Sequence, residues 1–470
     1  MDSITLRTWF TRVWTIQEYV MSRRARLICG NKIIDAERFF VALVDLDARL
    51  GDRYGSLAYP HFYNPYLEPY NNSFNSLKRF LVQHNFDAAQ VSLTRLLGYV
   101  QYRSSTNRRD SIDGLYGIIK KFHIDFPLPD YSRSIRDIFT DATRCVITQD
   151  KSLSLLIAIT GDVPDFPSWV PDWSKEPESI FSVTNFSYWD NFRASRNSAS
   201  IFRFLNGDNG LSVHDVIVDT ITCCTTLAVE VPGDIEVLGK YLNIETLSTG
   251  TIRRLYLATR KQFQQWIVLA NNLNNHGYHQ YLKGLTVNQA LCQTLVLDNT
   301  RDEDMIEFQR NLKGDNPGSY SRFGFEEWLL ANSLGVADDF VKYIHTSLQG
   351  RFPGKLPTLE DFETAPDTDV SDMGVEILML SSEAQKFLIM AIGTNIGMKF
   401  FTTSAQYMGK ALSSAQEGDV VMLISGVNHP MIARKTGEAY RLVCPAYVYG
   451  IMNGEKWPDN EEDLMDIVLS

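Results

Sequence analysis

The spacing of apolar residues changes along this chain, and that change constrains the fold more than any other feature. In residues 7–24, Trp9, Val13, Ile16 and Val20 recur every three or four positions, which lines one helix face. Similar spacing returns over 77–103, 111–122, 132–150 and 252–295. From residue 374 a helix leads into β-branched and aromatic runs at 400–403, 420–424 and 440–443. We therefore predict an α+β fold, with a helical N-terminal part, a mixed central region and a small antiparallel β sheet or barrel at the C-terminus.

Two shorter patterns predict strands outside the C-terminal region. Residues 26–34 flank the turn pair Gly30-Asn31 and predict a β hairpin, after which Asp35 is placed to cap a second helix. Residues 211–222 alternate apolar and polar side chains, as a half-buried strand does. We divide the chain into four parts: residues 1–50, a helical region with a loop insertion over 51–160, a mixed central region over 161–373, and a helix plus a β-rich module over 374–470.

The net charge of −11 limits the classes of partner. Nucleic acid and anionic membranes both attract clustered lysine and arginine, and the short run Arg23, Arg24 and Arg26 is too small to reverse the overall charge. We interpret that run as a solvated face near a helix end. The longest apolar run, 387–396, is too short for a bilayer, which takes about 20 residues. We expect protein partners, no nucleic acid and no membrane span, and the oligomeric state stays open.

Cysteine usage and motif content argue against a metal or cofactor. The six cysteines are scattered without a Cys-x-x-Cys pair, and no secretory leader is visible, so we expect reduced thiols and a cytoplasmic location. His276 and His279 have a spacing that two metal ligands on one helix face would need, but a polar turn precedes them and no acidic third ligand is near. We favour a surface loop there. No phosphate-binding glycine loop is present, and we predict no cofactor and no metal.

Four segments of the chain resemble the fungal heterokaryon incompatibility (HET) family, in the family's order. Residues 7–18 look like the closing motif of the HET domain, where an arginine and two tryptophans precede a Gln-Glu pair. Residues 109–117 resemble its Arg-Asp-Lys-Val-Tyr-Ala-Leu-Leu-Gly segment, with Asp113 where an aromatic is usual. Residues 167–174 match its Pro-Ser-Trp-Val-Pro-Asp-Trp-Ser segment at every position, and 400–452 resemble its closing β region. The family-motif residues are Trp9, Arg12, Trp14, Gln17, Glu18, Arg109, Asp110, Trp169, Pro171, Asp172, Trp173, Gly418 and Asp419.

The resemblance implies a cytoplasmic trigger of programmed cell death when genetically unlike fungal cells fuse. Family members usually open with Tyr-x-Ala-Leu-Ser-Tyr-x-Trp-Gly and Trp-Ile-Asp-Ala-Ile-Cys-Ile-Asn-Gln segments, and neither occurs here. We therefore expect residues 1–50 to be a C-terminal remnant of the HET domain. The domain is thought to resemble the TIR signalling fold, some members of which cleave NAD, but the residues for that activity would lie mostly in the missing segment. The chain is expected to act through protein contacts, as a regulator, a decoy or a truncated product.

Two other functions stay open. Glu18 follows a Trp-rich helix, and a carboxylate buried against tryptophan tends to keep its proton and can act as a general acid or base on a nucleotide-like molecule. We favour a structural role, in which Gln17 and Glu18 bind the hairpin or Arg12. In the other alternative the chain is a structural remnant without an activity of its own. Such a remnant would expose an apolar patch of Trp9, Phe10 and Trp14.

The segment 167–174 also has two interpretations. Its tryptophans and prolines suit either an aromatic ligand platform or a fixed, extended structural clasp. We favour the clasp, because tryptophan is mostly buried and proline fixes the backbone path. In that clasp, Asp172 would accept a backbone N–H.

Overall fold

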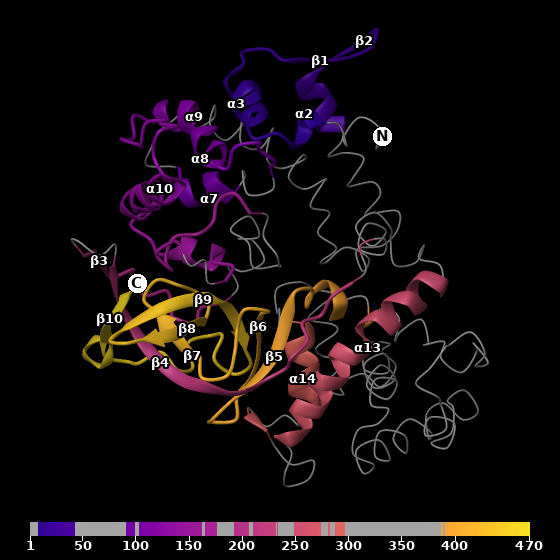
Figure 1. The fold of residues 1–470 in the computed structure, drawn as a ribbon, viewed down its shortest axis with the longest axis vertical. Helices are drawn as coiled ribbons and strands as arrows, with labels where there is room; N and C mark the ends of the chain where they lie inside the picture. Colours follow the sequence, from indigo (N-terminus) through magenta and orange to yellow (C-terminus); the bar gives the residue numbers. More distant parts are fainter. Residues whose placement is uncertain are drawn as a thin grey trace.

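A computed structural model gives the structure of the chain (Figure 1). It describes residues 8–42, 91–98, 103–161, 165–175, 192–205, 210–231, 233, 249–273, 281–282, 287–296, 387–388 and 391–470. The loops predicted over 51–76 and 300–370, the pair His276 and His279, and most of the predicted helix over 376–396 lie outside these residues. The fold class is confirmed: helices occupy the N-terminal part and an antiparallel sheet closes at the C-terminus.

The first helical segment is broken near its start. The prediction of one helix over 7–24 was wrong, because the structure has α2 (Thr8–Thr11) and α3 (Trp14–Met21). Arg12 forms a parallel bridge with Ser104, and the backbone N of Val13 donates to the carbonyl of Ser104 at 3.2 Å. A long-range partner thus takes backbone groups that a continuous helix would use itself.

The predicted hairpin follows as β1 (Arg26–Cys29) and β2 (Lys32–Asp35), joined by Gly30 at a φ of 58°. That positive φ suits glycine, which has no Cβ to clash with the backbone. The backbone N of Arg38 then donates to Asp35 Oδ1 at 3.1 Å, which caps a helix beginning at residue 36. The hairpin and the cap are both confirmed.

Four more labelled helices of the helical part lie among the described residues. They are α7 (Leu93–Gly98), α8 (Asp110–Asp113), α9 (Tyr116–Lys120) and α10 (Ile135–Asp150). Ser134 caps α10 by accepting from the backbone N of Asp137 at 3.1 Å. Asp150, at the other end of α10, accepts from the backbone N of Leu93 and of Thr94, both at 2.8 Å, and so holds the start of α7 against α10. The 3-10 helix η3 (Ser154–Ala158) then leads toward the barrel.

A closed β barrel fills the C-terminal part. Its strands are hydrogen-bonded in the ring order β4, β5, β6, β9, β8, β7 and back to β4. β10 pairs antiparallel with β4 and touches β9 in parallel at one position, and β3 pairs with β4. The strands are β3 (Phe202–Phe204), β4 (Leu211–Cys224), β5 (Met398–Thr403), β6 (Met408–Leu412), β7 (Val420–Ile424), β8 (Met431–Thr436), β9 (Ala439–Val448) and β10 (Met465–Leu469).

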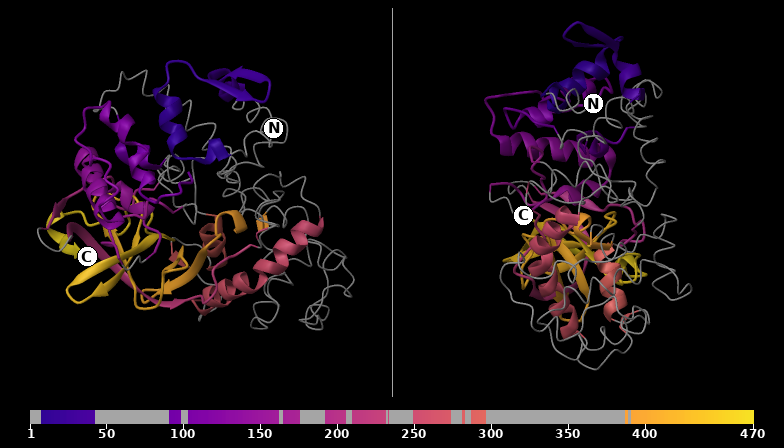
Figure 2. Two further views of the ribbon diagram at one scale, coloured as in Figure 1. Left: turned by 45° about the horizontal axis from the view of Figure 1, so that its top comes forward. Right: turned by 90° about the vertical axis from the view of Figure 1, so that its right-hand side faces the viewer.

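Helices cover the barrel on two sides. The helical part and η3 lie over one end, as the two views in Figure 2 show, and the core of this part continues into Met422, Ile424 and Leu442 of the barrel. α13 (Thr249–Asn272) and α14 (Val287–Val296) pack along β5 and β6. There the rings of Trp266 and Phe400 lie 5.4 Å apart between their centroids. The barrel therefore contacts both helical layers.

The barrel takes β4 from the central region of the chain and its other ring strands from residues beyond 397. β4 was predicted as a strand, although its place in the C-terminal sheet was not. The barrel therefore unites parts of two predicted regions, 161–373 and 374–470. The four domain bounds stay a prediction.

Candidate functional site

The first two family-motif segments contact each other directly. Gln17 Oε1, on α3, accepts from the backbone N of Gly117 on α9 at 3.2 Å. Gly114 lies so close to α3 that an added Cβ would stand 2.4 Å from Val13 Cγ1. Any larger residue at 114 would push α3 away. Gln17 therefore binds the second motif segment, where we had expected the hairpin or Arg12 as its partner.

Arg109 and Asp110 fix the turn that precedes α10. The guanidinium of Arg109 donates from Nη2 to the carbonyl of Arg133 at 2.8 Å. Tyr131 donates its hydroxyl to Asp110 Oδ1 at 2.8 Å, and this hydrogen bond raises the pKa of Tyr131 to about 12. Both motif side chains therefore hold residues 131–133 against the start of α8.

Asp113, the departure from the family pattern, is buried. Burial raises its pKa to about 6, and the nearby carboxylate of Asp110 adds to the effect. Its Oδ2 has no hydrogen-bond partner among the described residues. Because Asp113 is buried, this position is no solvent-facing turn, and the surrounding side chains pack around a carboxyl instead of an aromatic ring.

Asp172 is the centre of the third segment. Its side chain is 2% exposed and accepts from Arg108 Nη2 at 2.7 Å. Ser174 donates to Asp172 Oδ1 from its backbone N at 3.1 Å and from its hydroxyl at 2.6 Å. Arg108 also donates from Nε to Ser174 Oγ at 2.8 Å. The carboxylate is fully engaged, so this set of contacts locks the segment and leaves no free acid for chemistry.

The two tryptophans of this segment are fully buried. Trp173 donates its indole N–H to Thr143 Oγ1 of α10 at 3.1 Å. The ring centroid of Trp169 lies 5.7 Å from that of Phe204 in β3 and 5.9 Å from the guanidinium carbon of Arg144. Pro171, which lies between the two tryptophans in the sequence, is also buried. Buried indoles of this kind form a structural clasp between α10 and the barrel, and they offer no open platform for a ligand.

The clasp also binds the barrel through its backbone. The backbone N of Ser168 donates to the carbonyl of Ser470 at 2.8 Å, and Ser168 Oγ accepts from the backbone N of Leu442 in β9 at 2.9 Å. The segment does this in turns, because Val170 N donates to the Pro167 carbonyl at 2.9 Å. The predicted extended path was wrong in that respect: two consecutive turns present both faces of the segment, one to α10 and one to β9.

The pair Gly418 and Asp419 stands apart, on the barrel itself. Gly418 turns the chain at a φ of 87°, and the buried Asp419 directly precedes β7. Asp419 accepts from Arg434 of β8, at 2.8 Å from Nε and 3.0 Å from Nη2, and from the backbone N of Gln416 at 3.0 Å. This bidentate ion pair fixes the register of two neighbouring strands.

The structure places the remaining candidates at the surface or in the core. Glu18 is exposed on α3, so the burial against tryptophan that the catalytic hypothesis requires is absent at this residue. The exposed patch expected of a structural remnant was wrong as well: Phe10 is buried, Trp9 is half-buried against the helical core, and Trp14 is half-buried. Arg12 is exposed. Neither alternative function therefore gains support from the residues on which it depended.

The described residues form no metal site and no membrane span. No group of three or more His, Cys, Asp and Glu side chains among them is arranged to hold a metal ion. In the same part of the chain, no helix combines the length and the apolar character that crossing a bilayer demands.

Arg108 and Arg434 are the site residues that sequence reasoning missed. Arg108 directly precedes the motif residue Arg109, and a buried Asp172 needs a cationic partner, so the signal was present in the sequence. Arg434 lies in β8, a strand that the sequence patterns did not predict. The pairing of Arg434 with Asp419 could therefore not be predicted from the sequence.

Taken in order, the four segments form one continuous line of contacts. α3 binds α9, Arg108 beside α8 binds Asp172, and the segment of Asp172 binds β9 through Ser168. Each link is a hydrogen bond or ion pair within the protein. The arrangement is suited to transmitting or holding a conformation across the helical part and the barrel.

Comparison with known proteins supports the resemblance. Residues 339–465 match the Het-6 beta-barrel domain family. Over 197 residues the chain is 28% identical to heterokaryon incompatibility protein 6, OR allele, from Neurospora crassa. The aligned part is 36% of this chain and 28% of that protein. The chain thus matches about a quarter of the length of this curated relative. No solved structure matches the chain.

Proposed function

We propose that the chain acts in fungal self/non-self recognition, because it is similar to the Het-6 beta-barrel domain family and to heterokaryon incompatibility protein 6 from Neurospora crassa. The proposal is that it takes part in the programmed cell death that follows fusion of unlike cells. It would work in the cytoplasm, through contacts with other proteins.

The observation that carries this proposal is the line of contacts from α3 to the barrel. The motif carboxylates Asp172 and Asp419 are buried and bound to arginines, as structural residues are. A protein that signals by contact needs its parts held in register, whereas an enzyme of this size needs a pocket with convergent reactive groups. The motif residues fit the first description.

A fusion assay between fungal strains tests the proposal. The gene is replaced by an allele from an incompatible strain in one of two otherwise compatible strains, or it is deleted from one strain of the incompatible pair so made, and stable heterokaryons are counted. We expect the allele replacement to stop heterokaryon formation and to kill fusion cells, and deletion to restore fusion. Heterokaryon counts that are the same with and without both changes would contradict the proposal.

Expression of the chain by itself separates the roles within this function. A regulator or a decoy leaves the cell alive until a partner is present. Death on expression of the chain alone would exclude the decoy role, since a decoy cannot signal without its partner. Staining with a viability dye after induction gives the readout.

A further inference from the structure

The β1–β2 hairpin carries two strongly exposed apolar side chains that face each other. Ile28 is 69% exposed and Ile33 is 62% exposed. They are direct cross-strand partners, so their side chains lie on the same face of the hairpin. Leu27, on the opposite face, packs against the helical core and anchors the hairpin. The isoleucine face therefore points away from the protein, and Figure 1 shows the hairpin at the outer edge of the helical part.

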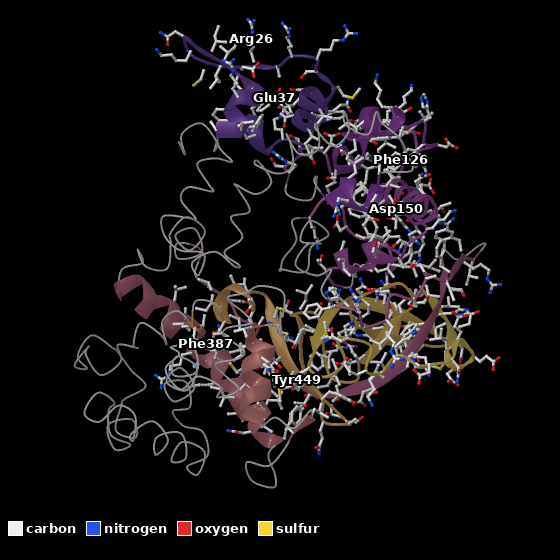
Figure 3. The ribbon with its side chains drawn as sticks, turned by 180° about the vertical axis from the view of Figure 1, so that it is seen from behind. Arg26, Glu37, Phe126, Asp150, Phe387 and Tyr449 are labelled. Carbon is white, nitrogen blue, oxygen red and sulfur yellow. The ribbon has the colours of Figure 1, made fainter. Side chains whose placement is uncertain are left out.

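Basic residues surround this apolar pair. Exposed cations stand at Arg23, Arg24, Arg26, Lys32 and Arg38, against the acids Asp35 and Glu37. Five positive and two negative side chains give a local charge of +3, in a chain whose net charge is −11. Figure 3 shows this end of the molecule, with Arg26 and Glu37 labelled. We call residues 23–38 the basic hairpin.

Both edges of the basic hairpin lack a strand neighbour among the described residues. Within the described residues, β1 and β2 form a two-stranded sheet that no third strand joins. A free strand edge accepts an extended segment through backbone hydrogen bonds, with side chains of the segment adding specificity. The edge, the isoleucine face and the cations are the elements of such a docking site.

We propose that the basic hairpin binds an acidic, extended segment of a partner protein that carries alternating apolar side chains. This inference rests on the proposed function, and it names the chemistry of the partner. The apolar side chains of the segment would cover Ile28 and Ile33, and its carboxylates would lie against the surrounding arginines. Burying the two isoleucines supplies affinity, and the charges select the partner.

Charge favours this occupant over a second copy or a membrane. A symmetric contact between two hairpins would bring a surplus of +3 against an equal surplus, which repels. An anionic bilayer is broad and meets the field of the whole molecule, whose net charge is −11. A single short segment meets mainly the charges within a Debye length, roughly 8 Å at physiological salt.

A peptide-binding experiment on the whole chain tests the proposal. The probe is a fluorescein-labelled peptide of about eight residues that alternates glutamate and valine, and binding is followed by fluorescence polarisation. We expect saturable binding that weakens as salt rises, and no binding of the matched lysine–valine peptide. The double variant Ile28→Thr/Ile33→Thr keeps β-branched residues in the strands, so the hairpin stays folded. It should lose about tenfold or more in affinity.

A matched control removes an equally exposed apolar side chain elsewhere. Leu128 is 70% exposed and lies outside the hairpin, so Leu128→Thr should bind the acidic peptide as the wild type does. Equal affinities for the wild type and the double isoleucine variant would overturn the proposal, and would mean that the cations only keep the strand edges from pairing. Isoleucine-dependent binding to phosphatidylserine vesicles, or an isoleucine-dependent dimer in sedimentation, would also overturn it.

This test is independent of the fusion assay. If peptide binding fails while the strains still show incompatibility, the function stands and the docking site is wrong. If the peptide binds but replacing or deleting the gene leaves the heterokaryon counts unchanged, the docking site stands and the cellular role is wrong.

Discussion

Single buried carboxylates in this protein fall into two groups. Asp172 and Asp419 each accept hydrogen bonds from an arginine and from a backbone N–H, so their charges are balanced. Asp215, in β4 opposite Ile424, is fully buried, and both its oxygens lack a hydrogen-bond partner among the described residues. Burial alone raises the pKa of Asp215 to about 7, so this side chain is held as a neutral acid over much of the acidic range.

The raised pKa of Asp215 predicts a pH-dependent stability. In the unfolded chain this carboxyl has its ordinary pKa near 3.8, and in the folded protein about 7. Its contribution to stability is therefore fully present below pH 3.8 and is lost as the pH rises to about 7, because ionisation favours the unfolded chain. We expect Asp215→Asn to raise the free energy of unfolding at pH 8 by about 3 kcal/mol, with little change near pH 4.

Urea unfolding at a series of pH values measures this effect. Asp113→Asn is the control, because Asp113 has a smaller shift, to about 6, with the same sign. That variant should keep the Asp215 part of the profile. An Asp215→Asn protein whose stability follows the wild type at every pH would show that this carboxyl is solvated when the protein is folded.

At the level of elements, sequence patterns predicted those that local spacing defines. The hairpin, the caps by Asp35, the helix α10 and the strand β4 all followed from turn chemistry or from periodicity. β6, β8 and β10 did not. β6 reads Met-Gly-Lys-Ala-Leu, without a β-branched residue, and Gly409 is required because an added Cβ would stand 2.5 Å from Phe401 Cζ. Such strands form because neighbours pair with them, which one segment of sequence cannot reveal.

The candidate site divides in the same way. The motif residues were visible in the sequence, and so were the Trp-rich clasp and the backbone N–H that Asp172 accepts. The partners were not, since Gln17 with Gly117 and Asp419 with Arg434 depend on how distant helices and strands pack. The same limit explains the wrong prediction for Phe10, whose burial depends on residues beyond its own helix.

Lys410 joins β6 to the end of α14 and predicts a cost for losing it. Its Nζ, fully buried, donates to the carbonyls of Leu295 and Thr394, both at 3.2 Å, and to Asn395 Oδ1 at 2.7 Å. The last carbonyls of a helix have no partner within the helix, so this amino group satisfies one for α14. Lys410→Met keeps the length and removes the donor, and we expect a loss of about 3 kcal/mol in the free energy of unfolding.

Chemical denaturation of purified protein measures that loss. Lys435→Met is the matched control, because Lys435 is exposed on β8 and should change stability by less than about 0.5 kcal/mol. Equal effects of the two substitutions would mean that the buried acceptors find other donors.

On the scale of the whole molecule, the clasp joins the helical part to the barrel. Arg108 and Thr143 hold it from the helical side, and Leu442 and Ser470 hold it from the barrel side. The two parts share one apolar core across this boundary. The clasp is therefore placed to transmit a conformational change from the helical part to the barrel.

Ser168→Ala should loosen that connection without unfolding either part. The substitution removes the acceptor for the backbone N–H of Leu442, at a cost of about 1–2 kcal/mol for an unsatisfied buried donor. Hydrogen–deuterium exchange resolved by residue should show faster exchange at Leu442, and unchanged exchange at Ile432, in the neighbouring strand. Unchanged protection of Leu442 would show that another group takes the place of the hydroxyl.

The long strand β4 has a consequence for how this protein is made. It pairs with β5, β7 and β10, all of which follow it by more than one hundred residues, and the ring closes only when β4 meets β7. During synthesis β4 leaves the ribosome well before those partners exist, with its edges open to other chains. Contacts so far apart in sequence make folding slow, and unpaired strand edges invite aggregation in the meantime. The ring of strands can therefore be completed only after β9 has been synthesised, and until then β4 stays without its barrel partners.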